Sequence, residues 1–124
     1  MSDIYTDLRA LLIGDAGVSS RVGARVIPNA FPEAVTLPAI TFEQVGRRDV
    51  KSTDGARARP RFRMRLHCWA NRKSDAVATA AAVRAALRAA EGGAFKYVTE
   101  TGEFDVYEPQ TNTYQQILDF EIRR

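Results

Sequence analysis

The chain has 124 residues, 45% of them hydrophobic and 27% charged, with a formal net charge of +3. This balance is typical of one globular domain with its own core, and it excludes a disordered or fibrous chain. No run approaches the roughly 20 apolar residues of a membrane-spanning helix, and Asp3 and Asp7 stand where a cleaved signal peptide needs positive charge. We therefore predict a single domain over residues 1–124, with no membrane span and no cleaved export signal.

The first predicted element is a helix that ends at Ile13, with Gly14 as its stop. Ser2 is the predicted N-cap, and Asp3 favours the positive end of the helix dipole. The apolar face of this helix is formed by Ile4, Leu8, Leu11 and Leu12.

A shorter helical pattern covers residues 15–23, where Val18 and Val22 lie four positions apart. Residues 25–27 are then expected to be extended. An irregular connection follows, marked by Pro28, Pro32 and Pro38.

Two strands are predicted from alternating side chains, over residues 39–48 and 61–70. In the second strand the predicted core face consists of Phe62, Met64, Leu66, Cys68 and Ala70. Its other face carries Arg61, Arg63, Arg65, His67 and Trp69. The stretch 49–60 between the strands has almost no large apolar residue, so it is predicted to be an exposed, mobile loop.

A second long helix is predicted from a Ser74 cap to Ala90, and Gly92 and Gly93 end it. Its buried stripe is alanine-rich, which implies close approach to a sheet: Ala76, Ala80, Val83, Leu87 and Ala90. The residues predicted to lie outside the stripe are Arg84, Arg88 and Glu91.

Three further strands are predicted over 95–101, 104–107 and 114–123, with Gly102 separating the first two. On the last strand, the predicted inward residues are Leu118, Phe120 and Ile122, and the outward ones are Asp119, Glu121 and Arg123. The outward acids can pair with the outward arginines of 61–70 if the two strands are neighbours. The order of elements predicts an α+β fold, with a mainly antiparallel sheet of about four to five strands packed against two helices.

The chain offers few groups for catalysis or metal binding. His67 and Cys68 are the only residues of their types, and as neighbours on a strand they point to opposite faces, so they cannot form a nucleophile pair. We predict that Cys68 is a small core residue and that His67 lies on the polar face. A zinc site lacks ligands, and no glycine pattern matches a nucleotide-binding loop. We therefore predict no catalytic residue, no metal, no cofactor and no enzymatic activity.

Four acids lie close together near the end of the chain: Glu100, Glu103, Asp105 and Glu108. Paired carboxylates can carry out acid–base hydrolysis, but acids around a turn without an apolar pocket are more often solvated. We interpret them as an acidic surface patch and a candidate interface.

The positive charge is concentrated between residues 47 and 65, where eight basic residues face only Asp49 and Asp54. The eight are Arg47, Arg48, Lys51, Arg57, Arg59, Arg61, Arg63 and Arg65. The last three form either a solvated ladder balanced by Asp119 and Glu121 or part of a contact surface. The other five have no evident acidic partner, so we predict that they contact DNA or a neighbouring subunit.

The ordered set of segments resembles the tail-completion, or tail-terminator, proteins of long-tailed phages. The resemblance runs from about Tyr5 to Ile122 and rests on YTDLRALLIGDAGVSSRVGARVIP, LPAITFEQVG, RFRMRLHCWA before SDAVATAAAVRAALRAA, and DVYEPQTNTYQQILDFEIR. It implies a structural virion protein that forms a ring, typically a hexamer, on the head-proximal end of the tail tube. Such a ring ends tube polymerisation and joins the tail to the head connector or stopper protein.

The resemblance also implies where the protein is found. It is made in the bacterial host cytoplasm and assembled at the head–tail junction of a virion or of a phage-derived gene transfer particle. Its implied partners are copies of itself, the tail-tube protein and the head connector. The basic residues then either meet the acidic patch of a neighbouring subunit or line the lumen, where they make weak, sequence-independent contact with passing DNA. The alternative to a ring is a nucleic-acid-binding module that uses segment 47–65.

Overall fold

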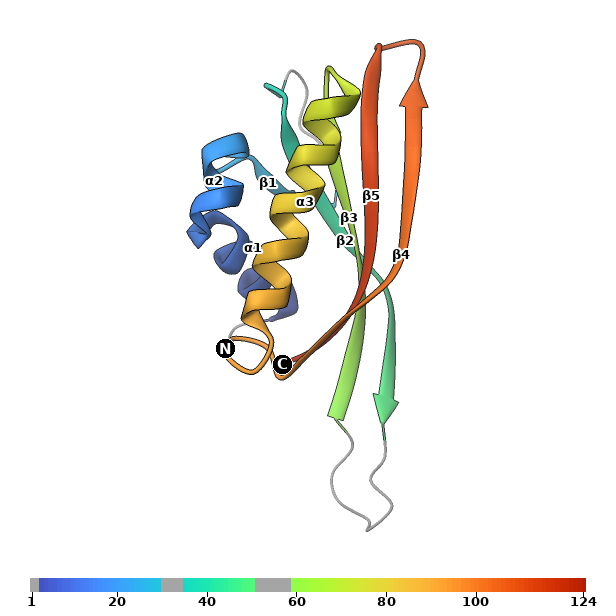
Figure 1. The fold of residues 1–124 in the computed structure, drawn as a ribbon. Helices are drawn as coiled ribbons and strands as arrows, with labels where there is room; N and C mark the ends of the chain where they lie inside the picture. Colours follow the sequence, from blue (N-terminus) through green and yellow to red (C-terminus); the bar gives the residue numbers. More distant parts are fainter. Residues whose placement is uncertain (1–2, 30–34, 51–58) are drawn as a thin grey trace.

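The computed structural model describes residues 3–29, 35–50 and 59–124, which form a five-stranded sheet with helices on one of its faces (Figure 1). The elements in chain order are α1 (Ile4–Gly14), α2 (Ala16–Val22), β1 (Val26–Pro28), β2 (Ala39–Val50), β3 (Arg59–Ala70), α3 (Lys73–Ala90), β4 (Tyr97–Glu108) and β5 (Thr113–Arg123). The predicted α+β class is confirmed. The short 15–23 pattern is also a helix, so the described residues contain three helices where the predicted fold class counted two.

The strands lie in the order β1-β2-β3-β5-β4. β1 pairs with β2 in parallel, and every other pairing is antiparallel, as expected for the main part of the sheet. β3 and β5 are neighbours in the middle, with Leu66 opposite Leu118 and Arg65 opposite Asp119. This register places the apolar residues of both strands on the helical side and their charged residues on the other side.

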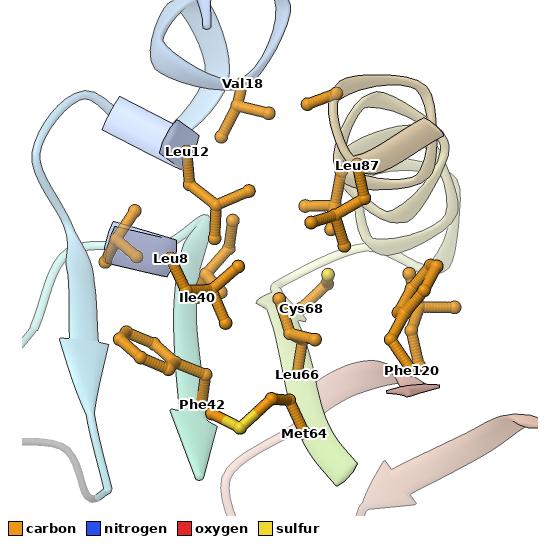
Figure 2. Packing of buried hydrophobic residues seen from close by; sticks show 14 of the residues in the cluster. Leu8, Leu12, Val18, Ile40, Phe42, Met64, Leu66, Cys68, Leu87 and Phe120 are labelled. Carbon is orange, nitrogen blue, oxygen red and sulfur yellow. The ribbon is translucent and has the colours of Figure 1, made fainter. Parts of the chain in front are cut away.

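The core lies between the helices and the sheet (Figure 2). Leu8 and Leu12 from α1 and Leu87 from α3 point toward Phe42 and Leu66 on the sheet, and all five side chains are fully buried. The predicted stripe of α3 is buried along its whole length, and its alanines allow the close approach of the helix to the sheet. Burial of this apolar surface is the main force that holds the layers together.

Both long helices begin differently from the prediction. α1 is capped by Asp3 and not by Ser2, because the Asp3 carboxylate accepts a hydrogen bond from the Thr6 N–H at 2.8 Å. α3 begins at Lys73, one residue before Ser74, and no side chain caps it. The predicted end of α3 is confirmed, since Ala90 is its last residue and Gly92 follows with a φ of 86°.

β4 is one continuous strand and not the two predicted strands around Gly102. The chain keeps pairing with β5 across this glycine through a register shift between Glu100 and Gly102, a β-bulge that places Thr101 out of the ladder. β2 has a matching shift between Gln44 and Gly46. Phe95, predicted to begin the strand, lies before it and is buried in the core.

The two bulges fall on one row of the sheet, because Gln44 pairs with Met64, Met64 with Phe120, and Phe120 with Glu100. Bulges increase the local twist of a sheet. Beyond this row, the β2–β3 hairpin extends past the helices, while the β4–β5 hairpin lies at the opposite end of the molecule (Figure 1).

The predicted loop 49–60 is shorter than expected. Both β2 and β3 continue into it, with Asp49 opposite Pro60 and Val50 opposite Arg59. The rest of that prediction, residues 51–58, lies outside the described residues, as do Pro32 and part of the predicted irregular connection. The C-terminus lies near α1, where the Arg124 guanidinium contacts the Asp7 carboxylate at 2.8 Å.

Candidate assembly surfaces

The helix-free face of the sheet carries a ladder of ion pairs between β3 and β5. The Arg65 guanidinium donates two hydrogen bonds to the Asp119 carboxylate, at 2.8 and 2.9 Å. Two residues further along β5, Glu121 accepts a hydrogen bond from Arg48 at 2.7 Å and contacts Arg61 at 3.6 Å. The predicted pairing of outward acids with outward arginines is therefore confirmed for Asp119 and Glu121.

Glu121 is the central anion of this ladder. It is nearly buried, at 9% exposure, yet it keeps its charge because it lies between two guanidinium groups. The hydrogen bond from Arg48 is the largest cause that lowers the pKa of Glu121 from 4.5, and Arg61 adds to it against the cost of burial. Arg48 was expected to have no acidic partner, and this contact corrects that expectation.

Aromatic rings from β4 extend the ladder to the edge of the sheet. Arg61 lies over the ring of Tyr97 at 4.1 Å, and Arg65 lies near the ring of Phe104 at 5.7 Å. Phe104 is 48% exposed, which leaves much of its ring in contact with solvent. Arg63 is exposed between these residues, and no ion pair among the described residues involves it.

The ladder ends in a hydrogen-bond network around His67. Its two ring nitrogens lie 2.8 Å from Glu43 Oε1 and from Gln115 Oε1, and its ring stacks on Trp69. Trp69 donates its ring N–H to the Thr41 hydroxyl. His67 is thus on the polar face, as predicted, and it serves the network there.

Cys68 points to the opposite side from His67 and is fully buried in the core. Burial raises the pKa of its thiol to about 12, so the thiolate is essentially absent at neutral pH. The two residues therefore do not meet, and the predicted core role of Cys68 is confirmed.

Three of the four predicted patch acids share one face of β4, and α3 partly neutralises them. Arg84 of α3 donates to both oxygens of Glu100, at 2.8 and 3.1 Å, and contacts Glu103 at 3.2 Å. Asp105 lies 3.8 Å from the Lys73 ammonium and is well exposed. Glu108 alternates onto the other face. The Arg84 contacts could not be found from sequence, because nothing in the helix pattern shows which strand lies beneath it.

The five basic residues predicted to form one contact surface do not all lie on the same face of the sheet. Arg47 and Arg48 lie next to each other on β2 and point to opposite faces, with Arg47 near the Phe62 ring at 5.6 Å and Arg48 on Glu121. Arg59 belongs to the first position of β3. Lys51 and Arg57 lie outside the described residues.

Neither a metal centre nor a bilayer-spanning helix is found in the part of the chain that the structure describes. Within residues 3–29, 35–50 and 59–124, no group of three or more His, Cys, Asp or Glu side chains is arranged to hold a metal ion. No helix there is both long and apolar enough to cross a bilayer. The residues that stand out are the charged and aromatic groups on the helix-free face of the sheet and the acids of β4.

Comparison with known proteins finds both a matching family and matching solved structures. A family model described as "Tail completion protein gp17" matches residues 6–124. Among solved structures, a chain from the "Virion of native gene transfer agent (GTA) particle" has the same fold, with a TM-score of 0.72 at 19% sequence identity. The match covers 97% of this chain and 92% of that chain. The search of curated proteins finds no match.

Proposed function

We propose that this chain, which belongs to the tail completion protein gp17 family, forms a ring on the head-proximal end of a tail tube. The family match over residues 6–124 is the observation that carries the proposal. Family membership makes the chain a structural component of a phage-like tail. The proposal adds a specific part: the ring ends tube polymerisation and presents a surface to the head connector or stopper protein. It assigns no catalytic step to the chain.

A cyclic ring needs two different surfaces on each subunit that fit each other. The chain has a basic hairpin end on β2 and β3 and a separate acidic edge on β4. Unlike charges on separate surfaces favour a head-to-tail contact over a symmetric dimer. We propose a hexamer as the ring number, on the resemblance stated above.

The alternative role, binding nucleic acid through segment 47–65, has less support. Arg48, Arg61 and Arg65 are held by Glu121 and Asp119, so this part of the segment has little charge left for phosphates. The alternative predicts that the isolated domain binds duplex DNA in a strongly salt-dependent way.

Electron microscopy of particles made without this protein tests the proposal. We expect tail tubes of irregular, increased length that are not attached to heads, and normal tails when the protein is supplied again. Tails of normal length joined to heads in its absence would remove the proposed role. DNA-binding measurements on the purified protein at two salt concentrations separate the ring from the alternative.

A further inference from the structure

The sheet has two long stretches of edge strand without a described neighbour. β4, a strand of 12 residues, pairs with β5 and with no other described strand, so its other side forms one edge of the sheet. On the other side, β1 covers β2 only as far as Phe42, and the stretch 45–50 has β3 as its one described strand neighbour. Open edges of this length are ready to pair with another strand.

On each edge, one backbone N–H is already hydrogen-bonded to a side chain. The Val98 N–H points away from β5 and donates to the Glu91 carboxylate at 3.0 Å. The Gln44 N–H points away from β3 and donates to the Tyr5 hydroxyl at 2.9 Å. Alternate residues of a strand direct their backbone groups to opposite sides.

The same alternation continues past each bulge, so it shows which backbone N–H and C=O groups point away from the paired strand. They are those of Glu103, Asp105 and Tyr107 on β4 and those of Arg47 and Asp49 on β2. These two sets lie on opposite edges of one subunit, so a single copy cannot pair them with each other. A neighbouring copy can.

Strand directions favour this pairing. The three antiparallel pairings from β2 to β4 make β2 and β4 run in opposite directions. A neighbour related by rotation about an axis along the strands keeps its own β2 direction. Its β2 therefore meets β4 in the antiparallel arrangement, which is the more stable one per residue.

Charge favours the β2 edge of a second copy over its β4 edge as the neighbour of β4. β4 carries Glu100, Glu103, Asp105 and Glu108 and no basic residue. Two β4 edges placed together in a symmetric dimer would bring these acids against each other. The β2 edge instead presents Arg47, whose side chain lies on the same side of the sheet as Glu103 and Asp105.

The offset between copies also fits a closed ring. Arg47 lies on the same row as Val98, four rows from Glu103 and six rows from Asp105 along the ladder. Four strands per copy at about 4.8 Å spacing, tilted by about 40° as in closed sheets, displace the next copy by about 16 Å, or about five residues. When the helices lie outside the ring, the right-handed tilt displaces the next copy in the direction that brings its Arg47 to Glu103 and Asp105.

We propose that β4 of one copy pairs with the 45–50 stretch of β2 in the next copy, so that the sheet continues from subunit to subunit around the ring. The partner is thus a second copy of this chain, joined head to tail through backbone hydrogen bonds, with Arg47 opposite Glu103 or Asp105. This inference rests on the ring proposed above.

The test compares Asp105→Pro with Asp105→Asn. Proline at this position removes an outward N–H and leaves the ladder to β5 intact, because proline is tolerated on an edge strand whose N–H faces outward. Asparagine keeps the N–H and removes the charge. Assembly on tail tubes is followed by electron microscopy and by native mass spectrometry. We expect Asp105→Pro to raise the concentration needed for rings by at least about tenfold, and Asp105→Asn to change it by less than about threefold.

Hydrogen exchange of the unmodified protein gives a second measurement that does not depend on folding of the proline variant. In rings, the amides of Glu103, Asp105 and Tyr107 are expected to exchange at least about tenfold more slowly than in monomers. Rings that form with these amides unprotected, or that tolerate Asp105→Pro, overturn the edge pairing and leave the ring intact. Absence of any ring on wild-type tubes overturns the proposed function and this inference together.

Discussion

The two faces of the sheet are held by different forces. On the helical face, Phe42, Leu66, Phe120 and their neighbours lose all or nearly all contact with water. On the helix-free face, Arg65 and Asp119 and the cluster around Glu121 remain partly exposed and are joined by charge. Apolar burial is strong and is not screened by salt, whereas exposed ion pairs contribute little and are screened. The stability of the fold therefore depends mainly on the helical face, and substitutions on the helix-free face are expected to cost less.

The largest effect is expected from removing a core ring. Phe120→Ala leaves a cavity between β5 and the helices and should lower the free energy of unfolding by about 3–5 kcal/mol. The matched control is Phe104→Ala, the same change on the helix-free face, where the ring is 48% exposed. We expect it to cost about 1 kcal/mol or less. Urea unfolding followed by circular dichroism measures both, and equal losses would contradict the contrast between the faces.

A smaller effect is expected from Glu121→Gln, which removes the anion shared by Arg48 and Arg61. The loss should be about 1–2 kcal/mol at pH 7, because hydrogen bonds to a nearly buried charge are lost while Arg48 remains solvated. The control is Glu108→Gln, an exposed acid, with an expected change within about 0.5 kcal/mol.

The same pair gives a pH dependence with a definite sign. The pKa of Glu121 is lowered in the folded protein, chiefly by the hydrogen bond from Arg48. Its contribution is therefore fully present above pH 4.5, the ordinary value, and is lost as the pH falls through the folded pKa. The stability difference between wild type and Glu121→Gln should shrink in acid. A difference that stays constant to the lowest pH at which the protein folds would show that the loss does not come from the charge of Glu121.

The sequence predicted which residues face the core, because that information is local. Alternation over 61–70 and 114–123 and the alanine stripe of α3 follow from strand and helix geometry alone. Strand continuity was harder to predict. Gly102 was interpreted as a break, yet tertiary pairing with β5 carries β4 through it as a bulge.

Contacts across the sheet were predicted only where two strands had matching patterns. Asp119 and Arg65 stand at alternating positions of two clear strands, so their pairing needed only that the strands be neighbours. Arg48 is the last residue of the predicted strand 39–48 and lies 73 residues from Glu121 in the chain, and the strand pattern does not show that it reaches this acid across β3. Arg84 reaches Glu100 because α3 lies over β4, which depends on packing of the whole domain. The strand register and the packing of the helices on the sheet therefore limit which contacts can be predicted from the sequence.

The smallest effects concern two neighbouring arginines of one strand face. Arg65→Gln breaks the two hydrogen bonds to Asp119 and should cost about 1 kcal/mol, reduced further at high salt because the pair is partly exposed. Arg63→Gln should change stability by no more than about 0.5 kcal/mol, because this exposed side chain makes no ion pair with the described residues. Thermal unfolding at low and at 1 M salt measures both. A loss for Arg63→Gln equal to that for Arg65→Gln would mean that the helix-free face acts as one continuous charged network and not as separate pairs.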